Sequence, residues 1–181
     1  MRQGAVGAVR LIERDGRRLV EKRMTDETRH DTEVRALRAL SGSGVPAPEL
    51  VDERTGSIVM TELPGVRVDE LDLDDRLDAL RRSAPILRAV HRLDPPPGLP
   101  PAPDDAAVVA RYRASDGPAL PLVIPAASGV AFCHGDWTDG NLLTDGRRIT
   151  GVVDWEAAHL GDPMRELARA AWGASRKDPR G

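Results

Sequence analysis

Three polar residues in the last third of the chain have types and spacing that suit binding of a metal ion and transfer of a proton. Asp136 follows a short apolar run, Asn141 comes five positions later, and Asp154 follows a second apolar run. Carboxylate and amide oxygens are the hard ligands that Mg²⁺ prefers, so Asn141 and Asp154 are candidate metal ligands. A carboxylate that does not bind the metal can orient an attacking hydroxyl and accept its proton, which is the role expected of Asp136.

Other interpretations of these residues are open at this point. A single aspartate after a strand is commonly a turn former or a helix cap, but turn chemistry does not require the joint spacing with Asn141. His134 precedes the tip of the loop, and we expect it to support the loop by packing and hydrogen bonding rather than to act as a base. The region also contains the ligand types of a metal-dependent phosphoesterase, which would hydrolyse phosphate esters without a nucleotide: His134, Asp136, Asp154 and His159.

Two short apolar strands, residues 130–133 and 149–153, are predicted to deliver these side chains. Asp162-Pro163 then suits the cap and the first turn of a final helix, and Asp162 is also a candidate partner of the loop around Asp136. Apolar residues follow at helical spacing and are predicted to lie in the core: Met164, Leu167, Ala168, Ala171 and Trp172. We expect Trp137 and Trp155 to pack in the interior.

The first third of the chain has the pattern of antiparallel strands. Residues 9–13 and 18–23 alternate in part between apolar and polar side chains. They are joined by Asp15-Gly16, which suits a hairpin turn because these residue types tolerate positive φ. Residues 49–52 and 57–61 are predicted to form a second strand pair.

Helices are predicted in three further segments of the chain. The first helix should follow the first strand pair, with Asp31 or Thr32 as its cap. Pro85 lies within a second helical segment, where it either kinks one helix or begins another that Ser83 caps. A short helix is expected over residues 106–113. The apolar stripe of the second segment consists of Leu73, Leu77, Leu80, Ala84 and Leu87.

The composition argues against several classes of function. The formal net charge is -3, and no long basic run supplies the positive surface that a nucleic acid requires. No apolar stretch reaches the length of a signal-peptide core or a membrane span. Cys133 is the single cysteine and cannot form an internal disulfide. We therefore expect a cytoplasmic protein with no nucleic-acid or membrane partner, and no feature indicates a protein partner, although one is possible.

The acidic run over residues 69–78 holds six carboxylates against the single Arg76. Such a run is usually the solvated face of a helix. It could also attract a cationic small molecule.

The motifs taken together resemble those of the aminoglycoside phosphotransferase and choline kinase superfamily. The resemblance is carried by His134-Gly135-Asp136 with Asn141, by Val153-Asp154-Trp155-Glu156 and by Leu160-Gly161-Asp162-Pro163. That superfamily shares the protein-kinase fold, so the resemblance implies a two-lobed α+β structure. It implies a small β-rich N-terminal lobe for nucleotide binding over residues 1–62. The remaining residues, 63–181, would form a mainly helical catalytic lobe, shortened at its C-terminus.

The same resemblance implies roles for residues earlier in the chain. Gly4 and Gly7 would belong to a glycine-rich loop over the nucleotide phosphates. Lys22 would reach those phosphates, with Glu33 as its ion-pair partner. Glu62-Leu63 would lie in the hinge between the lobes and hold the nucleobase. Lys22 could instead be an exposed strand lysine, and Glu33 could simply favour a helix N-terminus.

The implied activity is transfer of the γ-phosphoryl group of Mg-ATP or Mg-GTP to a hydroxyl of a small molecule. An aminoglycoside, another antibiotic or an amino alcohol would be such an acceptor. Asp136 would orient the hydroxyl, while Asn141 and Asp154 would hold Mg²⁺. The alternative is a non-catalytic, pseudokinase-like protein that binds a nucleotide or a protein partner.

Overall fold

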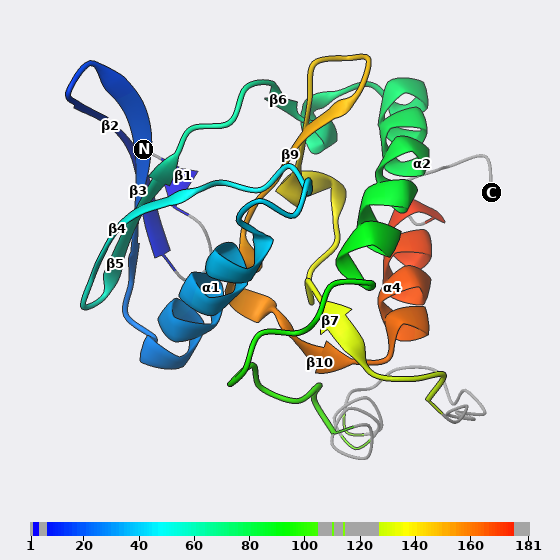
Figure 1. The fold of residues 1–181 in the computed structure, drawn as a ribbon. Coiled ribbons are helices and arrows are strands. Elements are labelled where there is room, and N and C mark those ends of the chain that lie inside the picture. Colours follow the sequence, from blue (N-terminus) through cyan, green and yellow to red (C-terminus); the bar gives the residue numbers. More distant parts are fainter. Residues whose placement is uncertain (1, 4–6, 105–109, 111–113, 115–126, 176–181) are drawn as a thin grey trace.

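The structure of this 181-residue chain is a computed structural model that describes residues 2–3, 7–104, 110, 114 and 127–175. Its N-terminal part is a five-stranded antiparallel sheet in the order β1-β2-β3-β5-β4. In Figure 1 this sheet lies on the opposite side of the molecule from helices α2 and α4. The strands are β1 (Arg2–Gln3), β2 (Gly7–Arg14), β3 (Arg17–Met24), β4 (Leu50–Arg54) and β5 (Ser57–Thr61).

Both predicted strand pairs form. Strands β2 and β3 pair from Gly7↔Met24 to Arg14↔Arg17. The turn between them places Asp15 at φ 54° and Gly16 at φ 70°, which is the left-handed geometry expected of a two-residue hairpin turn. Strands β4 and β5 pair around the turn that contains Gly56.

Helix α1 (Glu27–Leu40) begins earlier than either predicted cap, so the expectation of a cap at Asp31 or Thr32 is wrong. The cap is Asp26, whose Oδ1 accepts a hydrogen bond of 3.2 Å from the backbone N–H of Arg29. The helix starts almost directly after β3 ends at Met24. Thr32 is consequently buried inside the helix rather than placed at its end.

Helix α2 (Leu73–Val90) is continuous and contains Pro85. Of the two alternatives for this proline, the structure selects the single helix. Ser83 does not cap a second helix, because its Oγ donates a hydrogen bond of 2.8 Å to the carbonyl of Leu80. The cap is Asp72, whose side chain accepts from the backbone N–H of Asp75.

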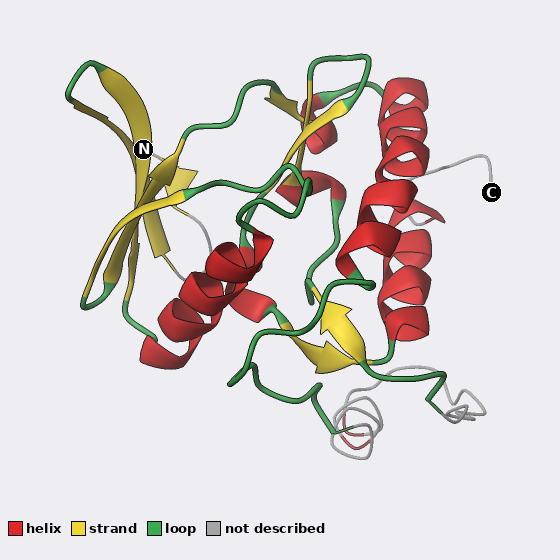
Figure 2. Ribbon diagram, in the orientation of Figure 1, coloured by secondary structure: helices red, strands yellow, loops and turns green. Residues whose placement is uncertain are grey.

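The remaining strands are short and form two small sheets. The three-stranded sheet has the order β6-β8-β9, and the two-stranded sheet pairs β10 with β7. The strands are β6 (Val66–Arg67), β7 (Ala131–Cys133), β8 (Leu142–Thr144), β9 (Ile149–Val152) and β10 (His159–Gly161). The described residues also form three 3₁₀ turns and helix α4: η1 (Val68–Glu70), η2 (Asp139–Asn141), η3 (Trp155–Ala157) and α4 (Pro163–Ser175). Figure 2 shows the strands of the N-terminal sheet gathered on one side of the molecule and the two long helices α2 and α4 on the other.

One apolar core runs from the N-terminal sheet to the helices. Its largest fully buried members come from several elements: Leu37, Ile58, Leu87, Phe132, Leu142 and Trp155. Trp155 packs against Phe132 with ring centroids 5.8 Å apart, and Trp137 is 3% exposed. Both tryptophans are thus buried, as predicted.

The prediction that one face of α4 lies in the core is wrong for three of its residues. Met164, Ala168 and Ala171 are exposed in the described structure. The helix instead turns Glu166 inward, because that carboxylate meets the loop after β7. The short helix expected over residues 106–113 lies almost wholly outside the described residues.

Within the described part of the chain, no helix combines the length and the apolar character that crossing a bilayer requires.

The shared core gives a first prediction. Leu37 is 1% exposed, so Leu37→Ala removes buried methyl groups and leaves a cavity. We expect it to lower the free energy of unfolding by about 2–5 kcal/mol, measured by urea denaturation. Leu11, which is 59% exposed, provides the control: Leu11→Ala should change it by less than about 0.5 kcal/mol. Equal losses in the two variants would contradict the placement of α1.

Candidate functional site

His134 fixes the start of the loop over residues 134–141 from inside the protein. It is fully buried, and its ring lies 4.4 Å from that of Trp155, centroid to centroid. Its Nε2 donates to the carbonyl of Val153 at 3.0 Å, and its Nδ1 accepts from the backbone N–H of Asp136 at 3.1 Å. Burial lowers the pKa of His134, which keeps the ring neutral and suits this pair of bonds. The ring therefore supports the loop, as expected.

Gly135 occupies a position that only glycine fits. Its φ is +86°, and a Cβ atom would lie 2.0 Å from the carbonyl oxygen of Ala157. The close approach brings the 134–141 loop against the segment that follows Asp154. The glycine is therefore required by the contact between two loops.

Asp136 is held on both of its carboxylate oxygens. Asn141 Nδ2 donates to its Oδ2 at 3.0 Å and to its backbone carbonyl at 2.9 Å. Arg169 of α4 donates to its Oδ1 at 2.8 Å and to the carbonyl of Gly135 at 3.2 Å. The Asp136 side chain remains 38% exposed, so it is fixed in direction yet accessible.

Asp154 follows β9 in a conformation that is rare for its residue type. It has φ 68° and ψ 63°, the left-handed region that costs a non-glycine residue free energy. The preceding residue, Val153, donates its N–H to the backbone carbonyl of Asn141 at 3.0 Å. The three residues predicted from spacing therefore lie on two loops that are hydrogen-bonded to each other.

Lys22 of β3 joins the N-terminal sheet to this site. Its Nζ lies 2.6 Å from Glu33 Oε2, 2.6 Å from Asp154 Oδ1 and 2.9 Å from Glu156 Oε2. The lysine side chain is only 8% exposed. Burial by itself would lower the pKa of Lys22, but the carboxylates of Glu33 and Asp154 outweigh it and hold that pKa above its ordinary value.

The carboxylates around Lys22 also form a set of hard oxygen donors. Glu33, Asp154 and Glu156 each offer an oxygen, and these atoms lie within 4.8 Å of one another. Three carboxylates exceed the charge of the Lys22 ammonium, and Arg29 compensates in part at 2.8 Å from Glu156. The bonds that Asn141 makes to Asp136 use its amide nitrogen, so its amide oxygen is the atom that it can offer to a cation. These donor types fit Mg²⁺.

Among the described residues, those predicted for the hinge and for the glycine-rich loop form no hydrogen bond or ion pair with Lys22, Asp136, Asn141 or Asp154. Glu62 pairs with Arg18 at 2.7 Å, and Leu63 lies against Gly151, with Cδ1 2.8 Å from the point where a Cβ would stand. Gly7 lies in β2, opposite Met24, and Gly4 lies outside the described residues.

The ligand set of the alternative phosphoesterase is not assembled. Both ring nitrogens of His134 are used within the loops, and His159 Nδ1 lies 3.0 Å from the carbonyl of Ala157. Among the described residues, the groups that could hold a metal do not include these histidines with Asp136 and Asp154.

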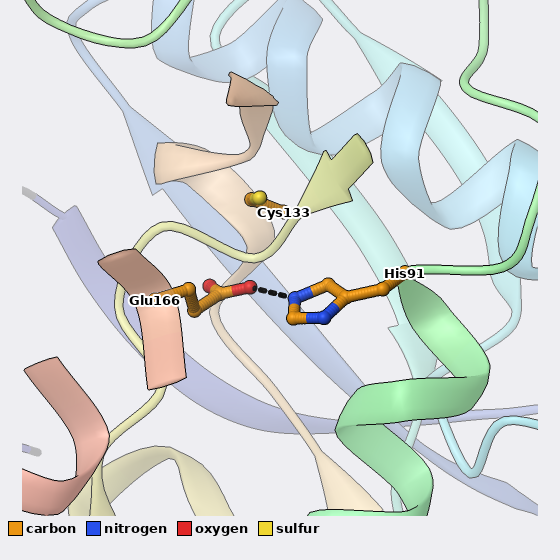
Figure 3. A group of neighbouring side chains, drawn as sticks. All are labelled: His91, Cys133 and Glu166. Carbon is orange, nitrogen blue, oxygen red and sulfur yellow. Dashed lines mark hydrogen bonds and ion pairs between the residues drawn. The ribbon is translucent and has the colours of Figure 1, made fainter. Parts of the chain in front are cut away.

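Three residues were not identified from the sequence: Glu166 and Arg169, which contact the 134–141 loop, and His91, which contacts Glu166 (Figure 3). Glu166 accepts the backbone N–H groups of His134 and Gly135, while Asp162, the predicted partner, accepts from Ser128 and from Met164 at the start of α4. Glu166 lies in the first turn of a helix, where an acidic residue is common because it interacts favourably with the helix dipole. Its position in the sequence therefore did not indicate a contact with a loop.

Comparison with known proteins extends these observations. The sequence model of a protein family, described as "Phosphotransferase enzyme family", matches residues 3–180 of this chain. An aminoglycoside-3'-phosphotransferase of type VIII superposes with a TM-score of 0.70 and 24% identity, covering 94% of this chain and 74% of that chain. A second structure is a thermostable mutant of aminoglycoside phosphotransferase APH(4)-Ia, in ternary complex with AMP-PNP and hygromycin B. It superposes with a TM-score of 0.66 and 19% identity, covering 93% of this chain and 69% of that chain.

A choline/ethanolamine kinase family protein from Mesorhizobium loti gives a TM-score of 0.67 and 20% identity, over 96% of this chain and 63% of that chain. The comparison with curated proteins found no match. At these identities the solved structures establish the fold, and the predicted two-lobed, protein-kinase-like α+β class is confirmed. The boundary between residues 62 and 63 stays a prediction.

The tight contact at Gly135 gives a second prediction. Gly135→Ala should cost about 1–2 kcal/mol for positive φ and roughly 1–3 kcal/mol more for the clash with Ala157, measured by urea denaturation. Gly146 has φ +89° and nothing within 4 Å of its Cβ position, so Gly146→Ala should show only the first cost. Equal destabilisation by the two substitutions would refute the close approach.

Proposed function

This chain belongs to the phosphotransferase enzyme family, as its motifs predicted, and from that premise we propose that it transfers the γ-phosphoryl group of Mg-ATP or Mg-GTP to a hydroxyl of a small molecule. The observation that carries the proposal is the convergence of Lys22 and Asp154 at 2.6 Å, beside the bonded pair of Asp136 and Asn141. A buried cation, oxygen donors and an accessible carboxylate are the parts that phosphoryl transfer requires.

The nucleotide is proposed to lie between the sheet and the two loops. Lys22, oriented by Glu33, would hold the α- and β-phosphates once the nucleotide competes with Asp154 for the ammonium. Gly4 and Gly7 would cover the phosphates with backbone N–H groups, and Glu62-Leu63 would hold the nucleobase. These roles follow the proposed division into a nucleotide-binding lobe, residues 1–62, and a catalytic lobe, residues 63–181.

Asn141 and Asp154 are proposed to hold the magnesium ion that accompanies the nucleotide. The amide oxygen of Asn141 and the carboxylate of Asp154 are the donors, and the excess of carboxylates around Lys22 favours a cation there. A bound Mg²⁺ would neutralise charge on the phosphates. The left-handed backbone at Asp154 would set the direction of its carboxylate.

Asp136 is proposed to orient the acceptor and to take its proton. The acceptor oxygen forms a bond to the γ-phosphorus, and the bond from that phosphorus to the β,γ-bridging oxygen breaks. The nucleoside diphosphate leaves with the bonding electron pair, and the hydroxyl proton passes to the Asp136 carboxylate. The reaction needs no covalent enzyme intermediate, since positioning and charge neutralisation supply the catalysis.

The proposed acceptor is a small hydroxyl compound such as an aminoglycoside, another antibiotic or an amino alcohol. A structure of similar fold is a complex with hygromycin B, and another belongs to the choline/ethanolamine kinase family. The carboxylates of residues 69–78, which begin α2 and the turn before it, would favour a cationic acceptor.

A second candidate function is binding without transfer. It is favoured by the ion pair between Arg169 and Asp136, which occupies one oxygen of the carboxylate that an acceptor would use. A protein of this kind would bind Mg-nucleotide and show a higher melting temperature, yet turn over no acceptor.

Replacement of the acceptor-orienting carboxylate gives the third prediction. Asp136→Asn should lower kcat by about 10²–10⁴-fold, because an amide cannot accept the proton. The Kd for Mg-nucleotide, measured by calorimetry, should stay within about twofold, since the substitution leaves the phosphate-binding groups intact. Asp15→Asn changes the same charge in a distant hairpin turn and should retain wild-type turnover. Unchanged turnover in Asp136→Asn would refute the assignment.

A screen for the acceptor gives the fourth prediction and tests the proposed function as a whole. Nucleotide consumption is measured over a panel of aminosugars, amino alcohols and other hydroxyl compounds, with product masses determined for each. We expect at least one product heavier by one phosphoryl group, formed only with Mg²⁺. Asp154→Asn should abolish its formation, because the metal loses a charged ligand. Nucleotide binding with no product from any acceptor would favour the second candidate function.

A further inference from the structure

We propose that an ion pair between Arg76 and Asp139 positions Asn141, the residue whose amide oxygen is the proposed magnesium ligand. The inference rests on the proposed function for its catalytic consequence, while its structural part can be measured without any acceptor. It also gives a role to Asp69, which the sequence presented only as one member of an acidic run.

Asp139 begins the turn η2, two residues before Asn141, and its carboxylate is buried. The side chain is 6% exposed. Its Oδ1 accepts from the backbone N–H of Gly140 at 3.1 Å, and its Oδ2 lies 3.7 Å from Nε of Arg76. The second distance is that of an ion pair rather than of a hydrogen bond. A buried carboxylate is strongly destabilised when its cationic partner is removed, so Arg76 keeps the turn in this position.

Arg76 is itself held by the segment that leads into helix α2. Its Nη2 donates to the backbone carbonyl of Asp69 at 2.6 Å and to that of Leu71 at 3.2 Å. The Arg76 side chain is 21% exposed. These bonds orient the guanidinium before it meets Asp139, so little side-chain freedom is lost in the ion pair.

Asp69 supports the same turn with its side chain. Its carboxylate accepts two hydrogen bonds from Arg67, from Nε at 2.9 Å and from Nη2 at 2.5 Å. A Cβ atom at Gly140 would lie 3.1 Å from Arg67 Nη2 and 3.6 Å from Asp69 Oδ2, so this pair packs directly on η2. The carboxylate of Asp69 is therefore engaged within the protein, whereas the other acids of the 69–78 run are exposed.

The turn η2 leads directly to the proposed metal ligand. The backbone N–H of Asn141 donates to the carbonyl of Thr138 at 3.1 Å, and the carbonyl of Asn141 accepts from Val153 at 3.0 Å. Asp139 lies between the two residues that the first bond joins, so a movement of Asp139 toward solvent would open that bond and displace Asn141. Mg²⁺ demands near-ideal octahedral placement of its ligands, and such a displacement would weaken its site.

The ion pair acts on the metal side of the 134–141 loop. At the other end of the loop, the Asp136 carboxylate has a separate bond from Arg169 of α4, which a movement of η2 leaves in place. Loss of the ion pair should therefore appear as weaker binding of Mg²⁺ rather than as lost chemistry once Mg²⁺ is saturating. A residue that only stabilised the fold would not change the Mg²⁺ dependence.

The experiment removes the two charges singly and together. Arg76→Gln and Asp139→Asn each leave one charge without its partner, whereas the double variant leaves neither. Arg81→Gln makes the same change at an exposed residue of α2 and is the control. Hydrogen exchange at the backbone amides of Gly140 and Asn141 is measured in each protein, together with kcat and the Kd for nucleotide at a series of Mg²⁺ concentrations.

We expect each single variant to speed exchange at Gly140 and Asn141 by at least about tenfold, with exchange in the β2–β3 hairpin unchanged. The Kd for nucleotide at limiting Mg²⁺ should rise by about tenfold, while the Kd without Mg²⁺ stays within about twofold. The kcat at saturating Mg²⁺ should stay within about threefold of wild type. The double variant should lie closer to wild type than either single variant, because it leaves no buried charge unpaired.

Wild-type exchange and wild-type Mg²⁺ dependence in both single variants would overturn the proposal. So would a double variant that shows the sum of the two single effects, because independent residues add. An equal Mg²⁺ defect in Arg81→Gln would also overturn it, since any charge removed from α2 would then have the same effect. If Arg76→Gln does not fold, Asp139→Asn, which keeps the shape of the side chain, still decides the question.

Failure of the proposed function can be told apart from failure of this inference. If the wild-type protein binds Mg-nucleotide but phosphorylates no acceptor, transfer is refuted, and the dependence of the nucleotide Kd on Mg²⁺ still decides whether the ion pair positions Asn141. If the protein binds no nucleotide, hydrogen exchange at Gly140 and Asn141 decides whether the ion pair holds the turn.

Discussion

The structure depends on one constraint, which is that a buried ammonium must be surrounded by carboxylates. Lys22 is almost fully enclosed, and an unpaired charge in that position would cost several kcal/mol. Its partners come from α1, from the residue that precedes the turn η3 and from that turn itself. The requirement to pair one cation therefore brings together the sheet, the first helix and the loop that carries Asp154.

A second constraint acts on backbone groups rather than on side-chain charge. The 134–141 loop leaves the strand β7 with N–H groups that must be paired inside the protein. Glu166 pairs two of them, and the ring of His134 pairs that of Asp136. Buried side chains thus set the backbone conformation, while Asp136 remains accessible. The site combines a rigid interior with a reactive surface.

Some elements could be predicted because their determinants are local. The hairpin at Asp15-Gly16 depends on positive φ at two adjacent residues, and its strands formed as expected. The predicted cap of α1 was wrong because several residues near its start could act as a cap. The position at which β3 ends decided which of them does. The prediction of which face of α4 is buried was wrong in part, because hydrophobic spacing does not reveal that Glu166 pairs with a loop.

By itself, the sequence identified Asp136, Asn141 and Asp154 as one group, since that depends on residue type and on spacing along one short segment. Through the resemblance that these motifs carry, it also implied the α+β fold class. Only the tertiary structure decided that Lys22 reaches Asp154 across 132 positions and that His91 reaches Glu166 across 75. The physical reason is that such contacts depend on how separate elements pack. No local preference of either residue specifies its distant partner.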